Sequence, residues 1–181
     1  MSHPAIAPNH VAVITGGASG IGLAAAMRFA GLGMKVCIAD LGGDRLKESE
    51  AKLASVARGA SADVMAMAVD VSRMEEVAEL ENAVRRRFGC ADILMNNAGI
   101  QPGSTMFGPP ENWQRVLGVN LWGIIHGSQV FAPRMIERGR AGLIINTGSK
   151  QGITTPPGDP AYNVSKAGVK AFTEALQHEL R

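Results

Sequence analysis

The sequence predicts an α/β fold built on a doubly wound parallel sheet. Short apolar runs rich in β-branched residues alternate with longer segments of helical period, and this alternation is typical of repeated βαβ units. A glycine-rich turn follows the first apolar run, and polar residues stand at or just past the ends of all five runs. We therefore expect a ligand in the crevice at the carboxyl ends of the strands.

The first half of the chain divides into strands and connecting helices. Strands are expected at residues 11–15, 35–40 and 64–69, and helices at 20–32 and 45–57. Gly33 stands where the first helix should end, because glycine readily adopts the backbone conformation of a helix C-cap. The second helix leads through Gly59 into the third strand.

The second half continues the alternation without an internal repeat or a linker. A helix at 73–88, a strand at 93–95, a helical stretch ending near 137, a strand at 143–146 and a final helix reaching the last residue are expected. Two loops rich in proline and glycine, at 101–110 and 151–160, precede the last two helices. We expect residues 1–181 to form a single dinucleotide-binding domain.

Composition narrows the function classes. Of 181 residues, 46% are hydrophobic and 19% charged, which does not match a disordered chain. A net charge of +2 is too small for a nucleic-acid or anionic-membrane partner. No apolar run approaches the roughly 18 residues of a membrane span, and residues 1–10 do not resemble a signal peptide. We expect a soluble, cytoplasmic protein.

Metal and disulfide chemistry are not expected. Cys37 and Cys90 do not form a pair with the spacing of metal ligands, and free thiols fit a reducing compartment. His126 and His178 lie in expected helices without a second ligand at metal spacing, so both are interpreted as ordinary surface or core histidines.

The glycine turn is the first candidate for cofactor binding. Residues 15–22 read TGGASGIG and open a helix, where glycines let backbone N–H groups approach a pyrophosphate. Gly16, Gly20 and Gly22 give the spacing GxxxGxG rather than the usual GxGxxG. A turn that serves only tight packing of a strand on a helix would contain the same residues, so the motif alone leaves both interpretations open.

Asp40 favours NAD over NADP. It ends the second expected strand, where a carboxylate can bind the hydroxyls of the adenosine ribose. A 2′-phosphate would meet like charge there, and neither the glycine turn nor Leu41 supplies a cation. By itself Asp40 also fits a solvated turn residue.

Tyr162 and Lys166 are the candidates for proton transfer. Tyr162 is the only tyrosine, and Lys166 follows four residues later on the same expected helix, so the two side chains share a face. An ammonium group stabilises a neighbouring phenolate, which can take a proton from an alcohol or return one to a carbonyl. The spacing alone also arises by chance.

Two further polar residues are weaker candidates. Ser149 follows the fifth strand, where its hydroxyl could bind the substrate oxygen, although serine in such a sequence also forms simple turns. Asn120 lies in an apolar helical stretch, where a buried amide needs partners. A helix kink satisfied by water is the alternative interpretation of Asn120.

Together these motifs resemble the short-chain dehydrogenase/reductase family, in order and over nearly the whole chain. The resemblance implies a Rossmann fold and a tetrad of Asn120, Ser149, Tyr162 and Lys166, with Tyr162 as general acid/base and Asn120 holding a relay water. It also implies that Asp70 lies at the adenine and that the Asn-Ala-Gly segment lies along the cofactor. The implied cofactor-binding residues are Gly16, Ser19, Gly20, Ile21, Gly22, Asp40, Asp70, Val71, Asn97, Ala98, Gly99, Tyr162 and Lys166.

The resemblance also sets expectations beyond the site. Family members continue past this last helix with two more strands, so we expect the chain to be a fragment lacking the C-terminal strands. A homotetramer or homodimer built on the helices around 121–138 and 160–181 is implied. The leading hypothesis is an NAD-dependent enzyme interconverting a secondary alcohol and a ketone. A non-catalytic NAD-sensing or scaffolding module, and an isomerase or lyase using bound NAD, are the alternatives.

Overall fold

The computed structural model describes residues 3–58 and 63–180, and within them the strands form one parallel sheet in the order β3-β2-β1-β4-β5. Strand order reverses beside β1, which pairs with β2 on one side and β4 on the other. This confirms the doubly wound sheet. The strands are β1 (Val11–Thr15), β2 (Lys35–Asp40), β3 (Val64–Ala68), β4 (Ile93–Asn96) and β5 (Leu143–Asn146).

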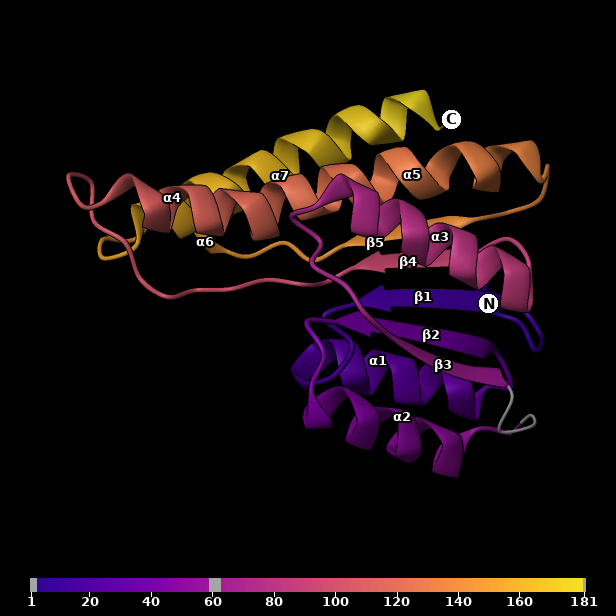
Figure 1. Cartoon of the computed structure of the whole chain (residues 1–181). Helices are drawn as coiled ribbons and strands as arrows, with labels where there is room; N and C mark the ends of the chain where they lie inside the picture. Colours follow the sequence, from indigo (N-terminus) through magenta and orange to yellow (C-terminus); the bar gives the residue numbers. More distant parts are fainter. Residues whose placement is uncertain (1–2, 59–62, 181) are drawn as a thin grey trace.

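Alternate side chains of β1 belong to two hydrophobic clusters, one on each face of the sheet. Ala12 and Ile14 pack in the cluster that includes residues of α1 (Gly20–Gly31) and α2 (Asp44–Val56), while Val11 and Val13 pack in the other. That second cluster includes residues of α3 (Met74–Phe88) and α5 (Gly123–Glu137). Figure 1 shows α1 and α2 below the sheet and α3 and α5 above it. The covered faces explain why the strands read as continuous apolar runs.

The long helical stretch after β4 is interrupted by a π-helical segment. Here α4 (Pro110–Leu117) passes directly into η2 (Gly118–Trp122), and η2 passes into α5. The final helix, α7 (Pro160–Glu179), packs against α4, η2 and the short α6 (Gln151–Thr154). Figure 1 shows that α4 and α6 project past the carboxyl ends of the strands. This lobe forms one wall of the site.

Three sequence expectations need adjustment. The segment 151–160, expected to be a loop throughout, begins with the single turn of α6. The third strand ends at Ala68, and because β3 lies at an edge of the sheet, its methionines are only partly buried. The last helix ends at Glu179. Gly59 and the final residue, Arg181, lie outside the described residues.

Candidate active site

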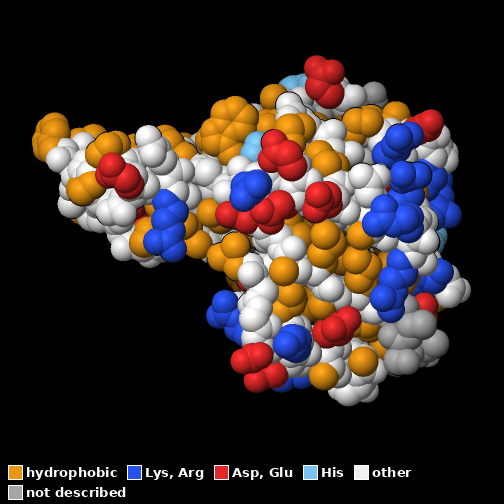
Figure 2. Space-filling model, viewed as in Figure 1, with side chains coloured by type: hydrophobic (Ala, Val, Ile, Leu, Met, Phe, Trp, Pro, Cys, Tyr) orange, Lys and Arg blue, Asp and Glu red, His pale blue; other side chains and the backbone are white. Residues whose placement is uncertain are grey.

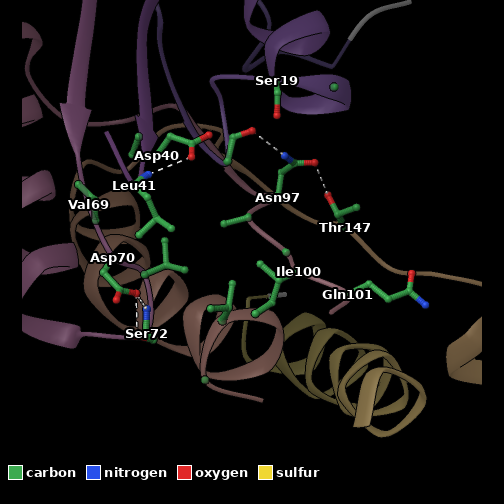
Figure 3. Close-up of a pocket in the computed structure, with 18 of the residues that line it drawn as sticks. Ser19, Asp40, Leu41, Val69, Asp70, Ser72, Asn97, Ile100, Gln101 and Thr147 are labelled. Carbon is green, nitrogen blue, oxygen red and sulfur yellow. Dashed lines mark hydrogen bonds between the residues drawn. The ribbon is translucent and has the colours of Figure 1, made fainter. Parts of the chain in front are cut away.

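A cavity of about 740 Å³ lies at the carboxyl ends of the strands. Its walls come from the turn after β1, the segments that follow β2 to β5, and residues of α4, η2 and α7. Figure 2 shows the molecule hollowed between its body and the projecting lobe. Figure 3 shows the polar side chains that reach toward this space from different strands. The position is the crevice that the sequence predicts.

Close contacts in the glycine turn leave no room for a Cβ at several positions. Gly16 has φ +64°, and a Cβ there would come within 2.7 Å of the Cα of Ala98. A Cβ on Gly22 would overlap the carbonyl oxygen of Gly16. Ser19 is the N-cap of α1 but makes no side-chain capping bond, and Ser19, Gly20 and Ile21 line the cavity. The N–H groups at this positive end of the helix dipole therefore fit an anion such as a pyrophosphate.

The carboxylate of Asp40 is held in place by backbone groups. Its Oδ2 accepts a hydrogen bond from the N–H of Ala18 at 3.0 Å, and its Oδ1 accepts one from the N–H of Leu41 at 2.9 Å. Figure 3 shows Asp40 at the cavity with the bond to Leu41. Each carboxylate oxygen has a further lone pair. The group can therefore still accept hydrogen bonds from the hydroxyls of a bound ribose.

The structure adds a cation to this end of the cavity. Arg45, exposed in the first turn of α2, lines the same cavity as Asp40. Arg45 was not predicted, because it lies outside the glycine turn and does not directly follow Asp40. The positive-φ residues Gly42 and Gly43 carry the chain from β2 into α2. No local sequence pattern marks Arg45 as a residue that reaches the cavity.

Asp70 and Val71 line the cavity beyond the end of β3. The Oδ1 of Asp70 accepts hydrogen bonds from the N–H and the hydroxyl of Ser72, at 2.9 and 2.7 Å. Val71 is buried, and its carbonyl oxygen lies 2.9 Å from Nδ1 of His126 on α5. These contacts hold the segment after β3 against the neighbouring helix and keep Asp70 at the cavity.

Asn97 connects the two halves of the site. Its Nδ2 donates to the carbonyl oxygens of Thr15 and Gly16 at 3.2 and 3.1 Å, and its Oδ1 accepts from the hydroxyl of Thr147 at 3.2 Å. Asn97 therefore ties the glycine turn to the segment that follows β5. Its neighbours Ala98 and Gly99 also line the cavity.

Tyr162 and Lys166 enter the cavity from α7. The Nζ of Lys166 lies 5.6 Å from the centroid of the Tyr162 ring and donates a hydrogen bond of 2.8 Å to the carbonyl oxygen of Thr147. Lys166 is only 4% exposed, and this burial lowers the pKa of its ammonium group from the usual value because desolvation disfavours the charged form. A phenol and a buried ammonium thus share one wall.

Asn120 lies behind this wall rather than in it. It is fully buried in η2, its Oδ1 accepts from the N–H of Ile100 at 2.8 Å, and its Nδ2 donates to the carbonyl oxygen of Ile100 at 2.9 Å. The same Nδ2 lies 3.3 Å from the hydroxyl of Ser165 on α7. Protein groups, rather than water alone, therefore satisfy this amide, and Asn120 fixes the backbone that follows Gly99.

Ser149 is a partly exposed residue between β5 and α6, and its Oγ accepts a hydrogen bond from the N–H of Gln151 at 3.2 Å. Like Gly22 and Asn120, it is not among the residues that line the cavity. The structure thus brings most of the predicted residues to one cavity and places these three behind or beside it.

Several lining residues were not predicted. Thr147, Ile100 and Gln101 directly adjoin predicted motifs, so their neighbours in sequence were a usable signal. Gln114 and Arg115 come from α4 and line the cavity together with strand ends that are far away in the chain. No local sequence pattern predicts that they reach it.

Two negative findings concern the described residues as a whole. No group of three or more His, Cys, Asp or Glu side chains there is arranged to hold a metal ion. No helix among them has the length and apolar character needed to cross a membrane.

Comparison with known proteins identifies relatives of this arrangement. The family model described as short chain dehydrogenase matches residues 10–181. The chain is 38% identical over 173 residues to 1-deoxy-11-beta-hydroxypentalenate dehydrogenase of Streptomyces exfoliatus, covering 94% of this chain and 62% of that protein. It is 36% identical over 171 residues to the 3-oxoacyl-[acyl-carrier-protein] reductase FabG of Thermotoga maritima, covering 94% and 68%.

A solved structure has the same fold as this chain. The short chain dehydrogenase/reductase of Burkholderia phymatum in complex with NAD superposes with a TM-score of 0.91 at 38% identity, covering 99% of this chain and 62% of that one. The chain thus spans less than two thirds of this neighbour. It spans only 28% of the Mycobacterium tuberculosis protein EphD, which is 38% identical over 168 residues.

Proposed function

Because the chain belongs to the short-chain dehydrogenase/reductase family, whose members bind a nicotinamide cofactor, we propose that it is an NAD-dependent oxidoreductase that interconverts a secondary alcohol and a ketone. One observation carries the proposal: Tyr162 and Lys166 line the same cavity as the glycine turn and Asp40. The proposed proton-transfer pair and the proposed dinucleotide cradle therefore line one cavity. Both hydrophobic clusters share one sheet, which supports a single dinucleotide-binding domain over residues 1–181.

The residues of the cavity fit NAD along its length. The N-terminus of α1, with Ser19, Gly20 and Ile21, would hold the pyrophosphate, and Asp40 would bind the adenosine ribose. Asp70 and Val71 would lie at the adenine, Asn97 to Gly99 along the middle, and Lys166 at the nicotinamide ribose. Bound NAD would supply the hydride acceptor, or NADH the donor. The fixed carboxylate of Asp40 supports NAD over NADP, because it would repel a 2′-phosphate.

The chain's own residues would manage the proton. The phenolic oxygen of Tyr162 would take a proton from the alcohol, or donate one to the ketone, and the Lys166 ammonium would stabilise the phenolate. Ser149 accepts from Gln151, so its O–H remains free to donate to the substrate oxygen. Asn120 has one acceptor lone pair beyond its bond with Ile100, which would serve a relay water.

A substitution of the single tyrosine tests this proposal. We expect Tyr162→Phe to lose at least about 100-fold in turnover of a panel of secondary alcohols and ketones, while its affinity for NADH, followed by fluorescence, stays close to that of the unaltered protein. Full turnover by the variant would contradict the mechanism. Absence of NADH binding by the unaltered chain would contradict the whole proposal, and conversion of a substrate without net NADH release would identify an isomerase or lyase instead.

A further inference from the structure

A second, smaller cavity adjoins the first. It measures about 390 Å³ and lies between residues 101–103, which follow β4, and residues 156–159, which precede α7. Gln101 lines both cavities. Asp159 lines the second cavity and is the N-cap of α7, three residues before Tyr162. The shape of this cavity and the position of Tyr162 therefore both depend on the joint where the segment 101–110 meets the start of α7.

Ser104 anchors the segment 101–110 at this joint. In the segment 101–110 it is the one buried residue, at 7% exposure, whereas Phe107 in the same segment is 99% exposed. The hydroxyl of Ser104 donates to Oδ1 of Asp159 at 2.5 Å and accepts from the N–H of Ala161 at 3.0 Å. Two bonds from one side chain thus attach an otherwise exposed loop to the first turn of α7.

Asp159 anchors the start of α7 at this joint. Its Oδ1 accepts from Ser104 and, at 3.4 Å, from the N–H of Tyr162 itself, while its Oδ2 is buried without a hydrogen-bond partner among the described residues. A serine would cap the helix without burying a carboxylate oxygen that lacks a hydrogen-bond partner. Capping alone therefore does not account for Asp159, whereas its short bond to Ser104 uses the reach of the longer side chain.

We propose that Ser104 and Asp159 are positioning residues for the reaction: their buried contact sets the start of α7, and with it the phenol of Tyr162, relative to the loop that walls the second cavity. The inference rests on the proposed function for its kinetic consequence. The geometric part stands alone, because it concerns only where Tyr162 lies. Neither residue touches the cavity that would hold the cofactor, so cofactor affinity is a separate readout.

The single tyrosine allows a direct test without any substrate. Protein labelled with ¹³C at Cζ of tyrosine gives a signal from Tyr162 alone. We expect Ser104→Ala to shift or broaden this signal at fixed pH, Ser104→Thr to restore it because the hydroxyl is retained, and Asp159→Ser to reproduce the alanine effect. The last variant keeps a good helix cap but is too short for the contact with Ser104.

Ser128→Ala is the matched control. Ser128 is also buried, and its hydroxyl donates to the carbonyl oxygen of Ile124 and accepts from Nδ2 of Asn96, away from the joint. The variant Ser128→Ala should lower the thermal unfolding midpoint about as much as Ser104→Ala does, but leave the Tyr162 signal unchanged. An unchanged signal in Ser104→Ala, or an equal change in Ser128→Ala, would overturn the proposal.

Kinetics supply the second readout. With an alcohol from the active panel, Ser104→Ala should lower kcat about 10-fold or more, since small misplacement of a catalytic group is costly, with unchanged NADH affinity and partial rescue by Ser104→Thr. A change in NADH affinity without a change in kcat would contradict the positioning role. If no panel compound reacts although the Tyr162 signal responds as expected, the proposed reaction fails and the positioning of Tyr162 stands.

Discussion

The ammonium group of Lys166 donates a 2.8 Å hydrogen bond to the carbonyl oxygen of Thr147, which anchors a residue of α7 to the segment that follows β5. The same Thr147 donates its hydroxyl to Asn97, which in turn binds the glycine turn. This chain of contacts runs from the proposed proton-transfer pair to the proposed cofactor cradle. It connects the two halves of the site through hydrogen bonds.

Removal of the Lys166 ammonium should affect both halves. We expect Lys166→Met to reduce turnover at least about 100-fold, because the phenolate loses its stabilising charge, and to weaken NADH binding several-fold. Lys170→Met is the control, since Lys170 lies one turn further along α7, is exposed, and forms an ion pair with Glu174. Steady-state kinetics and fluorescence titration measure both effects. Equal behaviour of the two variants would argue against the assigned role of Lys166.

Gly22 should tolerate no side chain. A Cβ at this position overlaps the carbonyl oxygen of Gly16, so Gly22→Ala should distort the turn and lower NADH affinity at least about 10-fold, with a loss of stability of about 1–3 kcal/mol. Gly31→Ala, near the end of the same helix with open space around its Cβ, should be neutral or stabilise by up to about 1 kcal/mol. Binding and urea denaturation of both variants test the contrast.

Cofactor preference should depend on the balance between Asp40 and Arg45. We expect Asp40→Ala to weaken NADH binding about 10-fold or more through loss of charge-assisted hydrogen bonds, and to strengthen NADPH binding because Arg45 then faces the 2′-phosphate without a competing anion. The NADPH gain should disappear in Asp40→Ala/Arg45→Ala but persist in Asp40→Ala/Lys47→Ala, since Lys47 is exposed on the same helix outside the cavity. Persistence in both would exclude Arg45.

Cys37 makes stability depend on alkaline pH. Burial raises the pKa of its thiol from 9.0 to about 12, so the native state keeps the thiol neutral while the unfolded chain ionises near the lower value. A raised pKa means that the stabilisation is complete below the unfolded pKa and is lost as pH rises through the window toward the folded pKa. Urea unfolding between about pH 7 and about pH 10 should show a steeper loss for the unaltered protein than for Cys37→Ala. Equal slopes would contradict this.

Much of the fold was predictable because its signals are local. The first four residues of β1 are apolar because both faces of its sheet are covered by helices, and Gly33 ends the first helix region with φ +80° as expected. The cavity at the carboxyl ends followed from where polar residues interrupt the apolar runs. The burial of β3 was harder to predict, because this strand lies at an edge of the sheet and has a neighbouring strand on one side only.

The candidate site was predictable only where a motif carries its own chemistry. The spacing of Tyr162 and Lys166 predicts that they share a helix face, and the glycine turn predicts close backbone contact. Asn120 was open between two interpretations because its partner, Ile100, lies twenty residues away and meets it only when η2 packs against the segment after β4. Arg45 escaped notice because nothing local shows that its side chain reaches the wall shared with Asp40.

The sequence by itself predicted most of the strands and helices and their order along the chain, the glycine turn, and the candidate residues for proton transfer, because each depends on backbone preferences and side-chain chemistry within a few residues. Tertiary structure alone decided the strand order in space, which sets β1 between β2 and β4, and the buried contact of Ser104 with Asp159. Such contacts join residues far apart in the chain, and their geometry exists only once the layers have packed.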